Sequence, residues 1–100
     1  MNTDRVLSMI SLARRARKAD TGAFMAEKAI QSGKAQLVIV ACDGADNIKK
    51  KFTNSCTYYE VEYMEYADKE QLGKCTGKEN IAVISINDSS FVKGIKSKLK

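Results

Sequence analysis

The chain has 100 residues and a formal net charge of +5, with 44% apolar and 29% charged residues. This size fits one ordinary domain rather than two, and the composition is typical of a globular protein rather than a disordered one. No apolar run approaches the roughly 20 residues that cross a bilayer, and the chain opens without a signal-peptide pattern, so we expect one cytoplasmic domain over residues 1–100 that does not contact a membrane.

Cysteine and histidine content limits the chemistry that the chain can support. Cys42, Cys56 and Cys75 form no Cys-x-x-Cys pair, and an odd number cannot complete a disulfide framework. Histidine is absent from the sequence, which nearly excludes a structural zinc site or a histidine-based catalytic relay. We therefore expect reduced, mostly buried thiols, no metal and no cofactor.

The excess positive charge lies in the first half of the chain. Residues 1–51 contain ten Lys/Arg against five Asp/Glu, whereas residues 52–100 contain seven of each. Clustered basic residues favour a nucleic-acid partner, because phosphate neutralisation releases condensed counterions. A merely solvated lysine surface remains the alternative. The basic residues best placed for RNA phosphates are Lys49, Lys50 and Lys51 together with Arg14, Arg15, Arg17 and Lys18.

The first third of the chain predicts two helices around a short strand. Apolar residues recur every three to four positions over residues 4–16, which indicates an amphipathic helix with Thr3 as its N-cap. A short strand is expected at 18–21, Gly22 allows a sharp turn, and a second helix is expected at 23–32, ending at the next glycine. The residues expected to be buried on these helices are Val6, Met9, Ile10, Leu12, Ala13, Ala16, Phe24, Ala26, Ala29 and Ile30.

The middle of the chain predicts a buried strand followed closely by a helix. Residues 37–41 form a continuous apolar run, typical of a strand covered on both faces at the centre of a sheet. Asp43 is expected to cap a third helix with Ala45, Ile48 and Phe52 on its buried side. A strand and a helix joined by little loop indicate α/β winding.

The remaining pattern predicts an edge strand, a short helix, a second buried strand and a last helix. Alternation at 58–63 indicates a strand with one solvated face, and a short helix is expected at 68–72. The apolar run 81–86 predicts a buried strand, after which Asn87 or Asp88 is expected to cap the final helix. That helix presents Phe91, Val92, Ile95 and Leu99 to the core.

The order of these elements predicts the fold class. Five helices alternate with four short strands, and two of those strands are apolar throughout. One helical layer could not cover both faces of such strands. The chain is therefore expected to form a three-layer α/β/α sandwich around a four-stranded mixed sheet.

Few residues suggest catalysis. A serine nucleophile would need a lysine base here, and no Ser-x-x-Lys motif stands at a convincing helix start. Residues 73–78 only superficially resemble a phosphate loop, because three rather than four residues separate their glycines. The pairs Asp43 with Asp46 and Glu60 with Glu62 are explained by helix capping and by a solvated strand face. We expect no enzyme.

Several motifs in a fixed order resemble a known family. Residues 32–35 lead into 37–43, residues 47–51 follow, and Gly73 and Gly77 precede the strand at 81–86. This pattern, over nearly the whole chain, resembles the kink-turn RNA-binding ribosomal-protein superfamily, with its L seven Ae and L thirty e proteins and the bacterial YlxQ-like ribosome-associated proteins. The resemblance implies an L thirty e-like sandwich without catalysis or cofactor. It also implies binding to a structured, kink-turn-like RNA such as rRNA and association with the ribosome. We expect the protein to be a monomer.

The resemblance also implies which residues contact RNA. Gly22 matches the glycine of the RNA-facing turn, and Lys28 matches a lysine of the second helix that meets phosphate. Lys69 matches a lysine of the short helix near the RNA bend, whereas Gly73 and Gly77 match turn glycines of the neighbouring loop. The remaining expected RNA-binding residues are Ala23, Phe24, Met25 and Lys78.

The chain departs from the family at the positions that read bases. Phe24 and Met25 stand where well-known members carry an Asn-Glu pair that hydrogen-bonds guanine edges. Periodicity places Phe24 in the core, with base stacking as the alternative, and leaves Met25 open. Lys78, Glu79 and Asn80 stand where relatives often have an apolar residue. The alternative function is therefore a protein-interaction module on the same fold, using the acidic strand region or the basic carboxyl-terminal end.

Overall fold

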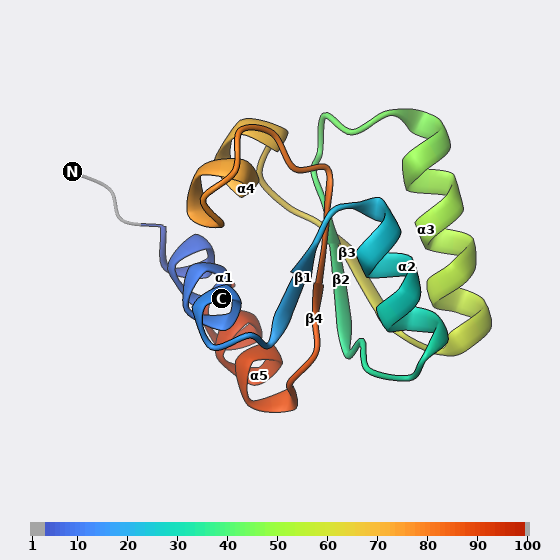
Figure 1. The fold of residues 1–100 in the computed structure, drawn as a ribbon, viewed down its shortest axis with the longest axis horizontal. Helices are drawn as coiled ribbons and strands as arrows, with labels where there is room; N and C mark the ends of the chain where they lie inside the picture. Colours follow the sequence, from blue (N-terminus) through green and yellow to red (C-terminus); the bar gives the residue numbers. More distant parts are fainter. Residues whose placement is uncertain (1–3, 100) are drawn as a thin grey trace.

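The computed structural model describes residues 4–99, and over this range the chain folds in the predicted element order (Figure 1). The elements are α1 (Arg5–Arg15), β1 (Ala19–Thr21), α2 (Ala23–Gln31), β2 (Leu37–Val40), α3 (Asp46–Tyr59), β3 (Glu62–Glu65), α4 (Lys69–Cys75), β4 (Val83–Ile86) and α5 (Ser89–Lys98). Within the described range, no helix combines the length and the apolar character needed to cross a bilayer.

The four strands form one mixed sheet in the order β1-β4-β2-β3. β4 runs antiparallel to both β1 and β2, with Leu37 opposite Ile86, and β3 runs parallel to β2, with Leu37 beside Glu62. The two apolar runs occupy the centre of the sheet, and every residue of β2 and β4 is buried. Three predictions are thereby confirmed: the mixed sheet, the central position of the first apolar strand and the burial of the second.

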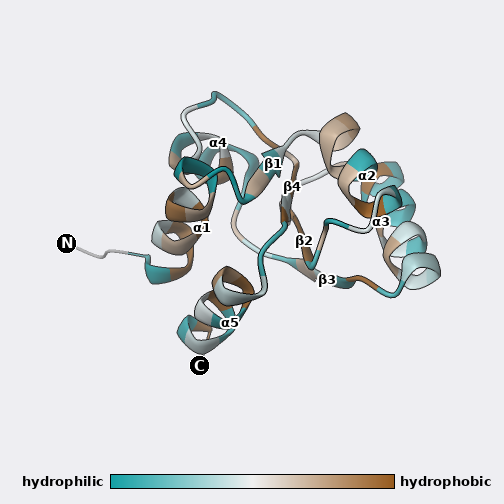
Figure 2. Ribbon diagram, turned by 60° about the horizontal axis from the view of Figure 1, so that its bottom comes forward, coloured by the Kyte–Doolittle hydropathy of each residue, from teal (hydrophilic) through white to brown (hydrophobic). Residues whose placement is uncertain are grey.

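Helices cover both faces of this sheet, as the fold class requires. α1, α4 and α5 lie against one face, and α2 and α3 lie against the other (Figure 1). Figure 2 shows the apolar segments of β2 and β4 between the two helical layers. Alternate strand residues supply the two cores: Leu37, Ile39, Ile84 and Ile86 face α1, α4 and α5, whereas Val38, Val40 and Val83 face α2 and α3.

The helices bury narrower stripes than their apolar periodicity predicts. Leu12 is 45% exposed and Leu99 is 46% exposed, and Ala16 is also exposed, at the end of α1. Leu12 lies about 200° around the helix from the fully buried Ile10, so both cannot face the same core. The expected N-cap Thr3 lies outside the described residues. In the structure Asp4 caps α1, its Oδ1 accepting a hydrogen bond from the Leu7 amide at 3.0 Å.

Two predictions around α3 are wrong. Asp43 does not cap this helix, which begins at Asp46 after an exposed Ala45 that makes no side-chain capping bond. The helix then runs as far as Tyr59, so the predicted strand at 58–63 begins only at Glu62. The alternating pattern at 58–63 includes the last turn of α3, so it predicts too early a start for the strand. The expected position of this strand at a sheet edge is confirmed.

Candidate functional site

One end of the sheet brings together the loops that the sequence analysis singled out. β1 ends at Thr21, and the Gly22 amide donates a hydrogen bond to the Val83 carbonyl at the start of β4, at 2.8 Å. The Ala41 amide, just after β2, donates to the Ala82 carbonyl at 2.8 Å. The β1–α2 turn therefore lies beside the loop that precedes β4, as the family resemblance implied.

Gly22 shapes the entry into α2. Its φ of +94° lies in a region that residues with a side chain rarely adopt, and a Cβ built there would meet nothing within 4 Å. Gly22 is the N-cap of α2 and offers no side-chain acceptor, and the first turn of α2 contains no acidic residue. The N–H groups of that turn, which begins with the partly buried Ala23, are consequently available to an anionic ligand at the positive end of the helix.

Phe24 and Met25 project from this turn toward solvent. Phe24 is 72% exposed and Met25 is 43% exposed, so the prediction that Phe24 completes the core is wrong. Successive helical residues are about 100° apart, which places Phe24 on the opposite side of α2 from the buried Ala26. An exposed ring at the start of a helix is positioned to stack on another planar group.

Lys28 supplies the free positive charge of this surface. Its Nζ lies 5.4 Å from the centroid of the Phe24 ring, one helical turn away. Glu27, the acidic residue of α2, pairs instead with Lys51 of α3 at 3.4 Å. Since no carboxylate within residues 4–99 lies in ion-pair distance of Lys28, the exposed face of α2 keeps its charge for an external anion.

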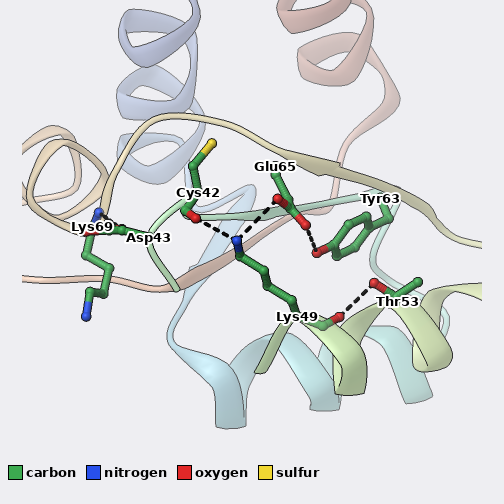
Figure 3. A network of polar contacts seen from close by, with 7 residues as sticks. All are labelled: Cys42, Asp43, Lys49, Thr53, Tyr63, Glu65 and Lys69. Atoms are coloured by element: carbon green, nitrogen blue, oxygen red, sulfur yellow. Dashed lines mark hydrogen bonds and ion pairs between the residues drawn. The ribbon is translucent and has the colours of Figure 1, made fainter. Parts of the chain in front are cut away.

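Two of the three lysines in the run 49–51 are engaged within the protein. The Lys49 Nζ donates to the Cys42 carbonyl at 2.6 Å and lies 3.5 Å from the Glu65 carboxylate (Figure 3). Lys51 pairs with Glu27, which leaves only Lys50 of the run unpaired among the described residues. The run therefore offers less free charge to RNA phosphates than the sequence suggests, because Lys49 anchors the loop after β2 and Lys51 is paired.

Asp43 holds the start of α4. Its Oδ1 accepts a hydrogen bond from the Lys69 backbone amide at 2.9 Å, while the Lys69 side chain points away from this contact (Figure 3). The Lys69 carbonyl in turn accepts from the Ile81 amide at 3.0 Å, which ties α4 to the segment before β4. Asp43 is a positioning residue that sequence reasoning missed, because the contact spans 26 residues.

The two glycines near α4 play different parts. Gly73 is buried inside α4, so the expectation that it is a turn glycine is wrong. A Cβ at Gly73 would collide with the Glu79 carbonyl, so glycine is needed for the loop to fold back against the helix. Gly77 is a turn glycine with a φ of +78°, as expected, and both it and Lys78 are exposed.

The thiols are not arranged for nucleophilic chemistry. All three cysteines are free, and burial raises the pKa of both Cys56 and Cys75 to about 11, so these thiols stay protonated at neutral pH. Cys42 is exposed, contrary to the expectation of mostly buried thiols. Among residues 4–99, no three His, Cys, Asp or Glu side chains gather as a metal site would require.

Comparison with known proteins adds an independent line of evidence. Residues 4–93 match the ribosomal protein L7Ae/L30e/S12e/Gadd45 family. The RNA-binding protein YlxQ of Bacillus subtilis is 36% identical over 83 residues, which is 83% of each chain. The RNA-binding protein YlxQ of Enterococcus faecium is 35% identical over 95% of this chain and 91% of the relative.

Solved structures show the same fold. A protein of unknown function from Bacillus halodurans superposes with a TM-score of 0.91 at 31% identity, over 97% of this chain and 98% of the other. The 15.5kD RNA binding protein of Giardia lamblia superposes with a TM-score of 0.79 at 24% identity, over 99% of this chain and 88% of the other.

Proposed function

Because this chain belongs to the ribosomal protein L7Ae/L30e/S12e/Gadd45 family, we propose that it is a non-enzymatic RNA-binding protein that recognises a kink-turn-like bend. The names of its bacterial relatives support RNA as the ligand. The target is a structured RNA such as rRNA, bound by a cytoplasmic monomer that associates with the ribosome.

The exposed amino-terminal end of α2 carries this proposal. There the open backbone of Gly22, the unpaired Lys28 and the exposed ring of Phe24 lie within two helical turns. The helix end and Lys28 suit RNA phosphates, and Phe24 suits the face of an unpaired base. A sharp bend offers such a base, whereas the deep, narrow major groove of a straight A-form helix keeps side chains away from base edges.

The chemistry of this surface also predicts how selective it is. Phe24 and Met25 cannot make the paired hydrogen bonds by which an Asn-Glu pair reads guanine edges. Binding therefore depends on RNA shape, phosphate contacts and stacking rather than on base identity. We expect changes of base sequence that preserve the bend to be tolerated.

A titration of fluorescently labelled RNAs tests the proposed function. The wild-type protein is titrated into a kink-turn RNA and into a straight duplex of the same composition, and the kink-turn RNA should bind at least about ten-fold more tightly, a difference of 1.4 kcal/mol. Lys28→Ala should weaken binding and lower the log-log salt slope by about one contact, or ~0.9. Lys93→Ala is the matched control, because this exposed lysine lies on α5, across the sheet from α2. Equal, weak binding to both RNAs would contradict the proposal.

One observation favours protein interaction as a second candidate function. Tyr58 is 79% exposed and Tyr59 is 43% exposed, and their rings lie 4.8 Å apart at the end of α3, beside the acidic edge strand β3. Exposed aromatic side chains are enriched at protein interfaces. A pull-down partner that survives ribonuclease treatment and is lost with Tyr58→Ser would support this candidate over RNA binding.

A further inference from the structure

Two adjoining hollows continue from the α2 surface along the free edge of β1. The first, of about 230 Å³, lies between Met25, Lys28 and Lys34. The second, of about 480 Å³, lies between Arg17, Lys18 and Lys34. Lys34 and Asp20 line both hollows, so the two form one surface, which we call the β1 groove.

Four cations face the β1 groove without internal partners. Arg17, Lys18, Lys28 and Lys34 make no ion pair within the described residues, whereas Lys49, Lys51, Lys74 and Lys96 each pair with a glutamate elsewhere on the surface. The one carboxylate of the groove, Asp20, accepts a hydrogen bond from the Asn87 side-chain amide at 3.0 Å. A concave surface with cations in excess of carboxylates concentrates polyanions.

Arg17 occupies a strained position at the edge of this groove. Its φ of +62° lies in the left-handed region, where glycine or asparagine would be less strained than arginine. The conformation is held where α1 ends, because the flanking Lys18 amide donates to the Ala13 carbonyl at 2.8 Å. The end of α1 therefore fixes Arg17 beside the second hollow, which this residue lines.

We propose that the β1 groove binds the phosphate backbone of the duplex arm that leaves the RNA bend, so that contact extends past the bend itself. This inference rests on the proposed function and adds a second contact region to it. The nine residues of α2 span about 14 Å at ~1.5 Å per residue. The groove therefore reaches past the carboxyl-terminal end of α2, where Lys34 lies, and its far end is well separated from the helix start that faces the bend.

Bent RNAs with arms of different length test this inference. Each arm in turn is shortened from ten base pairs to two, and affinity is measured for the full-length protein by fluorescence anisotropy. Lys18→Gln combined with Lys34→Gln removes two groove charges and preserves two polar side chains. Lys93→Gln combined with Lys98→Gln removes the same charge from exposed positions on α5 and serves as the control.

The inference predicts that one arm, and not the other, increases affinity with length. On the long-arm RNA the groove variant should lose two phosphate contacts, each of which contributes ~0.9 to the log-log salt slope. A slope lower by ~1.8 corresponds, at 0.1 M salt, to an affinity up to about 60-fold below that of the wild type. The same variant should bind the short-arm RNA like the wild type, and the α5 control should change neither affinity.

Two other outcomes overturn the inference for different reasons. Tight, bend-specific binding that depends neither on arm length nor on the groove charges would refute the β1 groove and leave the proposed function standing. Equal binding to bent and straight RNA would refute the proposed function, and the groove inference with it.

Discussion

Replacing Phe24 with alanine tests whether this ring belongs to the RNA-binding surface of α2 or to the core of the protein. Phe24 is 72% exposed, so it buries only roughly 50 Å² of the ~200 Å² that a fully buried aromatic residue would hide. At ~25 cal/mol per Å², the loss of this burial destabilises the fold by about 1.3 kcal/mol at most. The better helix propensity of alanine offsets about 0.5 kcal/mol of that cost.

The effect of Phe24→Ala on RNA binding should be larger than its effect on stability. Loss of one stacked base makes the free energy of binding less favourable by about 1 to 3 kcal/mol. This change raises Kd about 5-fold to 150-fold. By contrast, Phe52→Ala removes a fully buried ring and should destabilise the fold by about 3 to 5 kcal/mol. Thermal melting and an anisotropy titration of a kink-turn RNA, made on the same samples, measure the two effects.

Two further substitutions at this position show whether the aromatic face is responsible. Phe24→Tyr keeps the ring and should bind RNA like the wild type, whereas Phe24→Leu keeps the apolar character and should bind as weakly as Phe24→Ala. An alanine variant that binds within two-fold of the wild type would refute stacking. A fall in stability as large as that expected for Phe52→Ala would show instead that Phe24 belongs to the core.

Three other predictions concern the loops and the pH dependence of stability. Asp43→Ala removes the acceptor of the Lys69 amide and should lower the free energy of unfolding by about 1 kcal/mol, or Tm by roughly 4–8 °C. Asp43→Asn keeps an acceptor and should be less destabilising. Equal Tm values for the two variants would argue against this contact. Gly73→Ala places a methyl group against a backbone carbonyl and should destabilise the fold by about 1–3 kcal/mol in urea unfolding, and an unchanged urea midpoint would show that the loop yields freely. Burial, together with the hydrogen bond to Asp4, raises the pKa of Tyr66 from 10.0 to about 12, so its contribution is fully present below pH 10 and is lost as pH rises through about 12. Tyr66→Phe should lack that part of the alkaline destabilisation, and unfolding curves of wild type and variant that stay parallel over this pH window would refute the assignment.

Much of the fold could be predicted from the sequence because its strongest signals are physically unambiguous. The apolar, β-branched runs in β2 and β4 have few stable places other than the centre of a sheet with helices on both faces. Gly22 and Gly77 also stand where positive φ requires them. These features depend on local sequence and on burial, and both can be inferred from the residue types alone.

The candidate site was harder to predict because it depends on contacts between distant residues. The exposure of Phe24 follows from which side of α2 meets the sheet, and an apolar side chain gives no sign that it faces solvent. Asp43 looked like a helix cap because the preceding strand ends so close to it, yet its partner is Lys69. Which lysines are paired also depends on the fold, since Lys49 and Lys50 are neighbours in sequence but only Lys49 is engaged.

The two edges of the sheet differ in the charge that they expose. The β1 edge carries cations that pair with no carboxylate among residues 4–99, while the opposite edge, at β3, carries Glu62 and Glu65, each paired with a lysine. A molecule polarised in this way rotates as it nears a polyanion, so that collisions occur with the β1 side foremost. Added salt should therefore slow association more than it speeds release, which stopped-flow kinetics can resolve.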